Sequence, residues 1–216
     1  MKVGVDAVLL GAWANASNCS NVLDLGAGTG IISLMLAQKY SEIQIDAIEI
    51  NKSAFQDLEI NFNNSKWNNR LKAINKDYLN YDFDKKYKLI ISNPPYFTPS
   101  ESSISNNRKI ARIADTLTPS KIFSKSNTLL IDGGKFIIIY PFELRQIVIK
   151  AAFLNGLYLL SELIISDTKI SKPKRTILSF SNEFCINPKL YYINLKSTDK
   201  DIYSKEFEEL TKDFYL

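Results

Sequence analysis

Apolar and polar residues alternate along this chain in blocks of two kinds. Short apolar runs bounded by Gly, Pro, Asn or Asp predict buried strands, and longer segments with apolar residues at helical spacing predict helices. The predicted strands cover residues 22–25, 43–50, 71–75, 87–92, 134–140, 157–166, 175–181 and 190–195. The predicted helices cover residues 7–14, 31–39, 52–64, 119–130, 143–154 and 207–212.

Strands that alternate with helices are typical of a doubly wound α/β fold with a parallel sheet. The last third of the chain is richer in strands, which predicts antiparallel strands at one edge and therefore a mixed sheet. With 216 residues, 45% of them apolar, the chain can bury a full core, and we expect one domain over residues 1–216.

The amino-acid composition excludes several classes of function. The chain has no histidine, which removes Ser-His and Cys-His catalysis and most zinc sites. No apolar stretch is long enough to span a membrane, and the two cysteines favour reduced thiols in a cytoplasmic protein. A net charge of +4 permits a nucleic-acid partner without requiring one.

A glycine turn follows the first predicted strand, with the sequence Asp24-Leu-Gly26-Ala-Gly28-Thr-Gly30. Glycine lets backbone approach a ligand closely, and the following helix N-terminus favours polar or anionic groups. A dinucleotide fingerprint needs a third glycine at positions that Ile and Ser occupy here. Asp24 also suits a sulfonium cation and an ammonium group. The turn therefore indicates S-adenosylmethionine, with an ordinary strand-to-helix turn as the alternative.

Two further acids follow predicted strands. Glu49 ends the second strand, where an acid can accept hydrogen bonds from both ribose hydroxyls of a cofactor. Asp77 follows the third strand and could accept from the adenine amino group of the cofactor. A solvated aspartate at a strand end is the alternative for Asp77.

The tetrad Asn93-Pro94-Pro95-Tyr96 follows the strand over 87–92. The amino nitrogen of adenine, or of an amide, is a poor nucleophile because its lone pair is delocalised. If the Asn93 side-chain oxygen and the Pro94 carbonyl accept its two N–H groups, they stabilise the positive charge that develops during transfer. Pro95 fixes the backbone, and Tyr96 offers a ring for stacking a planar base. The tetrad predicts an N-methyltransferase that needs no metal or histidine base; a proline-rich turn is the alternative.

These motifs resemble those of the class I N6-adenine and amide N-methyltransferases. Five segments make the resemblance more specific, because they are similar to segments of the bacterial tRNA1(Val) (adenine-N6)-methyltransferases. They are Met1 to Trp13, Ser65-Lys-Trp67, Ser92 to Phe97, Ala111-Arg112 and Asp213 to Leu216. The resemblance covers almost the whole chain.

The resemblance implies a Rossmann-like, seven-stranded class I methyltransferase sheet, mostly parallel with antiparallel strands at its C-terminal edge. It implies S-adenosylmethionine as cofactor and methyl transfer to N6 of the adenine 3′ of the anticodon, position 37, in tRNA1(Val). Two features depart from the family. Val5 stands where Thr is usual, and relatives usually carry a segment before the position of Met1 that closes over the cofactor or touches RNA.

Residues outside these motifs are further candidates for the cofactor and for RNA. Lys2 and Asp6 precede the helix expected to cover the cofactor, with an ordinary N-terminal cap as the alternative for Asp6. Two groups of basic residues are candidates for binding the phosphates of the anticodon stem. The alternative is that they are ordinary solvated surface side chains. They contain Arg108 and Arg112, and Lys172, Lys174 and Arg175.

Three other functions stay open at this stage. A protein glutamine N5-methyltransferase would use the same tetrad on an amide, but with a separate helical substrate-binding domain. A DNA adenine-N6 methyltransferase usually needs a dedicated base-recognition domain. A non-catalytic cofactor-binding module would be indicated by a degraded tetrad or glycine turn, and both motifs are intact here. We expect a monomer that binds tRNA and neither a membrane nor a metal ion.

Overall fold

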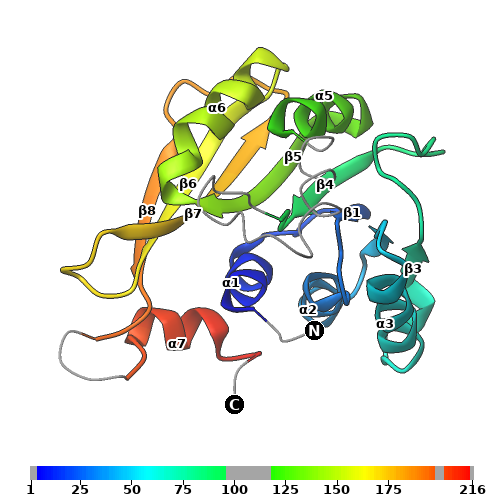
Figure 1. Ribbon diagram of the computed structural model, residues 1–216, viewed down its shortest axis with the longest axis horizontal. Helices are drawn as coiled ribbons and strands as arrows, with labels where there is room; N and C mark the ends of the chain where they lie inside the picture. The colour runs from blue at the N-terminus through cyan, green and yellow to red at the C-terminus, as the bar shows by residue number, and fades with distance from the viewer. Residues whose placement is uncertain (1–3, 96–117, 198–201, 215–216) are drawn as a thin grey trace, which may run out of the picture.

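The strands assemble into one twisted sheet with helices on both faces (Figure 1). The computed structural model describes residues 4–95, 118–197 and 202–214. The strands are β1 (Asn21–Leu25), β2 (Gln44–Ile48), β3 (Leu71–Ile74), β4 (Tyr87–Ser92), β5 (Leu130–Pro141), β6 (Tyr158–Ser166), β7 (Pro173–Ser181) and β8 (Lys189–Asn194). The helices are α1 (Val5–Trp13), α2 (Ile31–Lys39), α3 (Lys52–Asn63), α5 (Pro119–Leu129), α6 (Arg145–Leu154) and α7 (Lys205–Thr211), with 3₁₀ turns η1 (Asn68–Arg70) and η2 (Phe142–Leu144).

The strand order within the described ranges is β3-β2-β1-β4-β5-β7-β6-β8. Strands β1 to β5 are mutually parallel, and β7 runs antiparallel to both of its neighbours. This confirms the expected Rossmann-like α/β sheet, mostly parallel with antiparallel pairing in its C-terminal part. Two details differ from the expectation. The sheet has eight strands, because β8 adds parallel to β6 at the edge. The antiparallel strand β7 lies inside the sheet. The chain crosses from β5 through α6 to β6 and leaves one strand position open between them, and β7 then occupies that position.

The two largest apolar clusters of the described residues lie on opposite faces of the sheet. On one face, α1, α2 and α7 bury residues such as Leu10, Leu36 and Phe207 against the sheet. On the other face, α5 and α6 bury residues such as Phe123 and Val148. Figure 1 shows these two helix layers on opposite sides of the strands. Such burial on both faces explains why the central strands read as continuous apolar runs.

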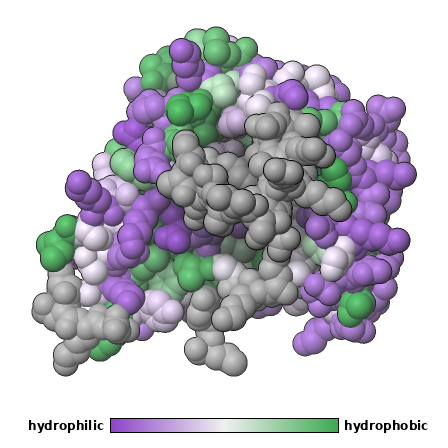
Figure 2. All heavy atoms as spheres, viewed as in Figure 1, coloured by the Kyte–Doolittle hydropathy of each residue, from purple (hydrophilic) through white to green (hydrophobic). Residues whose placement is uncertain are grey.

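Helix α3 lies beside β3 and packs only one side on the sheet. Leu58 and Phe62 are buried, whereas most of its other side chains are exposed and polar. Figure 2 shows the hydrophilic surface that results at the β3 side of the molecule. None of the helices in the described ranges has the length and apolarity that crossing a bilayer would require.

The register of the central strands defines where a site can form. Leu25 of β1 lies opposite Ile48 of β2 and Ser92 of β4. The carboxyl ends of three adjacent parallel strands therefore meet at one edge of the sheet. In open α/β sheets, ligands bind outside this edge.

Candidate active site

The glycine turn after β1 is tied to the end of β2. The backbone N–H groups of Gly26 and Ala27 both donate to the Ile48 carbonyl, at 2.9 and 3.1 Å. Gly26, Gly28 and Gly30 have φ angles of 70°, 57° and 86°. All three therefore occupy left-handed backbone conformations that glycine adopts without steric cost.

The first and last of these glycines serve different purposes. A Cβ placed on Gly30 would lie 2.5 Å from Leu58 Cδ1 and 2.7 Å from Phe62 Cε1, so this glycine lets α3 pack against the turn. A Cβ placed on Gly26 would have no heavy atom of the described residues within 4 Å. Within the part of the chain that the structure describes, the space over Gly26 is therefore open for a ligand to approach the backbone.

Asp24 is fully buried at the end of β1. Its Oδ2 accepts a hydrogen bond from Ser33 Oγ of α2 at 2.7 Å, and its Oδ1 has no hydrogen-bond partner among the described residues. Burial raises the pKa of Asp24 to about 6, although the hydrogen bonds from Ser33 oppose that increase. A buried carboxylate with one unsatisfied oxygen is costly unless a cationic or hydrogen-bonding group completes it.

Glu49, directly after β2, links the turn to the start of α3. Its Oε2 accepts from the Gly28 N–H at 2.9 Å, and its Oε1 accepts from the Asn51 N–H at 2.7 Å. Asn75 Nδ2 donates to the Glu49 carbonyl at 2.8 Å and fixes this residue from the β3 side. Each carboxylate oxygen can accept a second hydrogen bond, so Glu49 can still bind ribose hydroxyls.

Asp77 closes a tight turn after β3. Its Oδ1 accepts from the Leu79 N–H at 2.9 Å, and its Oδ2 accepts from Asn80 Nδ2 at 2.6 Å. Asp77 is half-buried, and these local bonds account for its place in the fold. Its contact with a cofactor adenine stays a prediction.

The tetrad begins next to the glycine turn. Ser92 Oγ donates to the Leu25 carbonyl at 2.8 Å, and both residues are buried. The residues that follow this bonded pair are Gly26 on one strand and Asn93 on the other. Asn93 is half-buried, Pro94 is buried and Pro95 is exposed, whereas Tyr96 lies outside the described residues.

Asp6 stands in the first turn of α1 and does not cap it. The N-cap is Gly4, so the alternative of an ordinary N-terminal cap by Asp6 is wrong. Asp6 instead forms an ion pair with Arg175 of β7. Burial raises the pKa of Asp6, and Arg175 opposes that increase. Lys2 lies outside the described residues.

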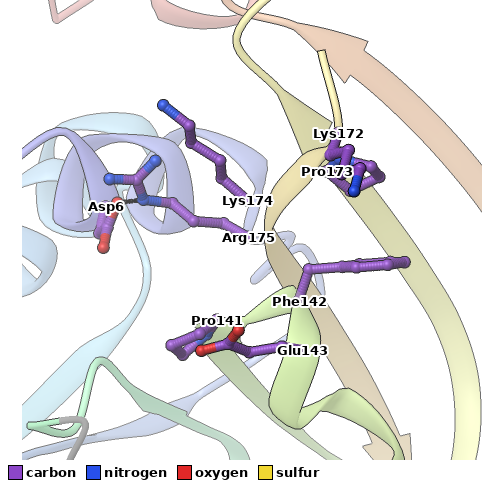
Figure 3. Close-up of a pocket in the computed structure, with 8 residues that line it drawn as sticks. All are labelled: Asp6, Pro141, Phe142, Glu143, Lys172, Pro173, Lys174 and Arg175. Carbon is purple, nitrogen blue, oxygen red and sulfur yellow. Dashed lines mark ion pairs between the residues drawn. The ribbon is translucent and has the colours of Figure 1, made fainter. Parts of the chain in front are cut away.

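The second basic group lies at one pocket of about 620 Å³ (Figure 3). The pocket is lined by Asp6, Pro141, Phe142, Glu143, Lys172, Pro173, Lys174 and Arg175. Three of the predicted nucleic-acid residues therefore come together, next to the predicted cofactor residue Asp6. Arg108 and Arg112 lie outside the described residues.

Comparison with known proteins decides the family. The profile of the family described as "Methyltransferase small domain" matches residues 6–156. The tRNA1(Val) (adenine(37)-N6)-methyltransferase of Aliivibrio fischeri (strain MJ11) is 39% identical over 217 residues, which cover 100% of this chain and 91% of that protein. The protein of the same name from Bacteroides thetaiotaomicron is 37% identical over 219 residues, with the same coverage of both chains. The chain belongs to the tRNA1(Val) (adenine(37)-N6)-methyltransferase family.

Solved structures confirm the fold of this methyltransferase. A protein of Agrobacterium tumefaciens described as a predicted O-methyltransferase superposes with a TM-score of 0.73 and 15% identity, covering 96% of both chains. The glycopeptide N-methyltransferase MtfA, solved with S-adenosylmethionine, gives a TM-score of 0.57 and 10% identity, covering 75% of this chain and 86% of that one. At such low identities the likeness concerns the fold alone.

Sequence reasoning missed several residues that the structure places at this edge of the sheet. Ser33 lies one helical turn after Gly30, and its position in the first turn of α2 was a usable signal. Ser92 belongs to the motif around the tetrad, but its hydrogen bond to β1 depends on strand order. Phe142 carries no motif, and only the pocket reveals it.

Proposed function

We propose that the protein transfers the methyl group of S-adenosylmethionine to N6 of the adenosine at position 37 of tRNA1(Val), in the cytoplasm. One observation carries the proposal. The β1–β4 register and the bond from Ser92 to Leu25 bring Asn93 beside the glycine turn at Gly26. The names of full-length relatives support adenine in tRNA as the acceptor.

The residues present fit S-adenosylmethionine. Open space over Gly26 admits the cofactor to the backbone, and the unsatisfied Oδ1 of Asp24 suits the ammonium group of its methionine part. Glu49 would accept the ribose hydroxyls while it holds Gly28, and Asp77 would accept the adenine amino group. When bound, the cofactor supplies an electrophilic methyl group on its sulfonium sulfur.

The tetrad would prepare the nucleophile. The Asn93 side-chain oxygen and the Pro94 carbonyl would each accept an N–H of the adenine amino group. These acceptors draw the nitrogen lone pair out of the ring and stabilise the positive charge that develops on N6. Tyr96 would stack on the base, and alignment within reach of the methyl group supplies the rest of the acceleration.

The experiment that tests this function uses tRNA from a strain that lacks the gene. The tRNA is incubated with protein and S-adenosylmethionine, and its nucleosides are analysed by mass spectrometry. We expect N6-methyladenosine confined to one tRNA with the wild type, and none with Asn93→Ala, whose cofactor affinity stays unchanged. Asn68→Ala, at an exposed position in η1, is the matched control with full activity.

Two results would contradict the proposal. The absence of any methylated nucleoside with the wild type would exclude this acceptor. An Asn93→Ala variant that lost cofactor affinity as severely as methyl transfer would place Asn93 in the cofactor site and not at the acceptor.

A further inference from the structure

The pocket at Phe142 lies at the same edge of the sheet as the tetrad. In the parallel β4–β5 pair, Ser92 lies opposite Ile138, and β5 continues from there to Pro141, which lines the pocket. Adjacent strands are about 4.8 Å apart and each residue advances about 3.3 Å, so Pro141 at the pocket lies roughly 11 Å from the end of β4. A nucleotide next to the target adenosine can therefore reach it.

Phe142 is a half-exposed aromatic ring that is fixed from behind. The Arg145 guanidinium carbon lies 4.7 Å from the ring centroid. Arg145 Nε lies 3.5 Å from Glu162 Oε1, and that buried carboxylate also accepts from Thr176 Oγ1 at 3.0 Å. This support holds the ring in place before any ligand arrives, and a planar base stacks well on such a ring.

The cations around the ring are not equivalent. Arg175 forms an ion pair with Asp6, and Lys174 forms one with Asp167. Across the described residues, Lys172 is in no ion pair, and its side chain is exposed. Its ammonium group is thus the pocket cation whose charge is not already compensated by a carboxylate.

Two acidic residues line the pocket, and Glu143 is the one outside the Asp6–Arg175 ion pair that can orient a bound nucleotide. Glu143 and Lys172 lie on opposite sides of Phe142 in Figure 3. A phosphate is repelled by the Glu143 carboxylate and attracted by Lys172. The carboxylate can instead accept from a ribose hydroxyl or an amino group of a base.

We propose that this pocket binds the nucleotide that flanks the target adenosine, with its base stacked on Phe142 and its phosphate on Lys172. The inference rests on the proposed function, because it needs an RNA substrate at the tetrad. The pocket volume of about 620 Å³ falls within the range of small-ligand pockets and admits a base with its sugar.

The test measures methyl transfer to an anticodon stem-loop RNA by Phe142→Leu, Phe142→Trp and the control Phe153→Leu, an exposed aromatic position on α6. Loss of a stacked base predicts an increase of roughly 5- to 150-fold in KM for RNA with Phe142→Leu. We expect kcat at saturating RNA and cofactor affinity to stay unchanged. Phe142→Trp keeps a stacking surface and retains the low KM.

An abasic nucleotide identifies the partner of the ring. RNA without the base on the 5′ or the 3′ side of the target adenosine is compared with intact RNA. For one of these two positions, we expect the abasic change to raise KM with the wild type and to have no further effect with Phe142→Leu. If the effect of the abasic change and the effect of Phe142→Leu on KM are independent and additive at both positions, the stacking contact is excluded.

Salt dependence tests the phosphate contact separately. Lys172→Gln should lower the slope of log K against log salt by about 0.7 for a single-stranded contact, and Lys150→Gln on α6 should leave it unchanged. If the wild type methylates RNA and Phe142→Leu leaves the KM for RNA unchanged, the pocket assignment is wrong but the proposed function is not contradicted. A wild type that transfers no methyl group to RNA would overturn the proposed function and this inference together.

Discussion

Asp6 of α1 and Arg175 of β7 form an ion pair that joins the first helix to the strand end carrying the basic group. The side chains are 21% and 31% exposed, so water screens the pair only in part. Sequence reasoning placed Asp6 at the cofactor and Arg175 at the RNA. Their pairing means that the helix expected to cover the cofactor is held by the surface expected to contact the substrate.

Breaking this pair should destabilise the fold modestly. Exposed pairs contribute at most about 1 kcal/mol and breaking buried ones costs about 3–5 kcal/mol, so Arg175→Gln, which leaves the partly buried Asp6 carboxylate without its cation, should lower the free energy of unfolding by about 1–2 kcal/mol. Urea denaturation measures the change. The exchanged pair, Asp6→Arg with Arg175→Asp, should recover part of the loss. Glu209→Gln, which removes the exposed pair with Lys212, should have almost no effect. Equal stabilities of Arg175→Gln and the wild type would contradict the structural role.

Alanine at two glycines of the same turn should have opposite consequences. At Gly30 the new methyl group overlaps Leu58 and Phe62 and the backbone is left-handed, so Gly30→Ala should cost about 2–5 kcal/mol of folding free energy. At Gly26 there is space for the methyl group, so only the backbone cost of about 1–2 kcal/mol applies. Gly26→Ala should therefore fold but bind S-adenosylmethionine weakly. Thermal unfolding and calorimetric titration separate the two; a stable Gly30→Ala or a tightly binding Gly26→Ala would contradict this division.

Local patterns predicted the elements of the sheet better than their arrangement. The helix predicted over 31–39 has those bounds in α2, because the glycine turn starts it and its apolar spacing continues to Lys39. The strand predicted over 43–50 is shorter, since Glu49 directs its carboxylate to the backbone of neighbouring turns. The position of β7 between β5 and β6 depends on which strands pair, and periodicity along one strand carries no such information.

The same distinction applies to the site. The sequence placed Asp24, Glu49 and Asn93 at or near the ends of predicted parallel strands, and parallel strands share one edge of the sheet at their carboxyl ends. The bond between Ser92 and Leu25 and the pairing of Asp6 with Arg175 join residues distant in the chain. Such contacts depend on strand order and helix placement, so only the assembled fold reveals them.

Glu49→Gln tests whether the carboxylate holds the turn. A glutamine side chain has one acceptor oxygen, so the N–H of Gly28 or of Asn51 would face an amide donor. Losing one charge-assisted hydrogen bond of about 1.5–3 kcal/mol should raise the Kd for S-adenosylmethionine by at least about tenfold. Isothermal titration calorimetry gives this value. Glu59→Gln, on the exposed side of α3, is the matched control. An unchanged Kd for Glu49→Gln would exclude this role.

The raised pKa of Asp24 predicts that cofactor affinity depends on pH. A cationic group of the cofactor is attracted to the ionised carboxylate, so binding should weaken as pH falls through about 6. Below that pKa, the Kd should rise about tenfold per pH unit, because binding then requires the release of one proton. Titrations from pH 5 to pH 7 should show this dependence in the wild type. Asp24→Asn should bind more weakly and show no such pH dependence.

The stability of the protein without cofactor should also depend on pH, and the raised pKa of Asp24 sets the direction of that dependence. Because the folded pKa of Asp24 lies above its ordinary value of 3.8, folding is favoured most when the group is protonated in both states. This contribution is complete below about 3.8 and is lost as pH rises through about 6. As the pH rises from 4 to 7, the free energy of unfolding of Asp24→Asn should therefore increase relative to that of the wild type. Urea denaturation at several pH values measures this difference. A constant difference over this interval would show that Asp24 is not a buried carboxylate with a raised pKa.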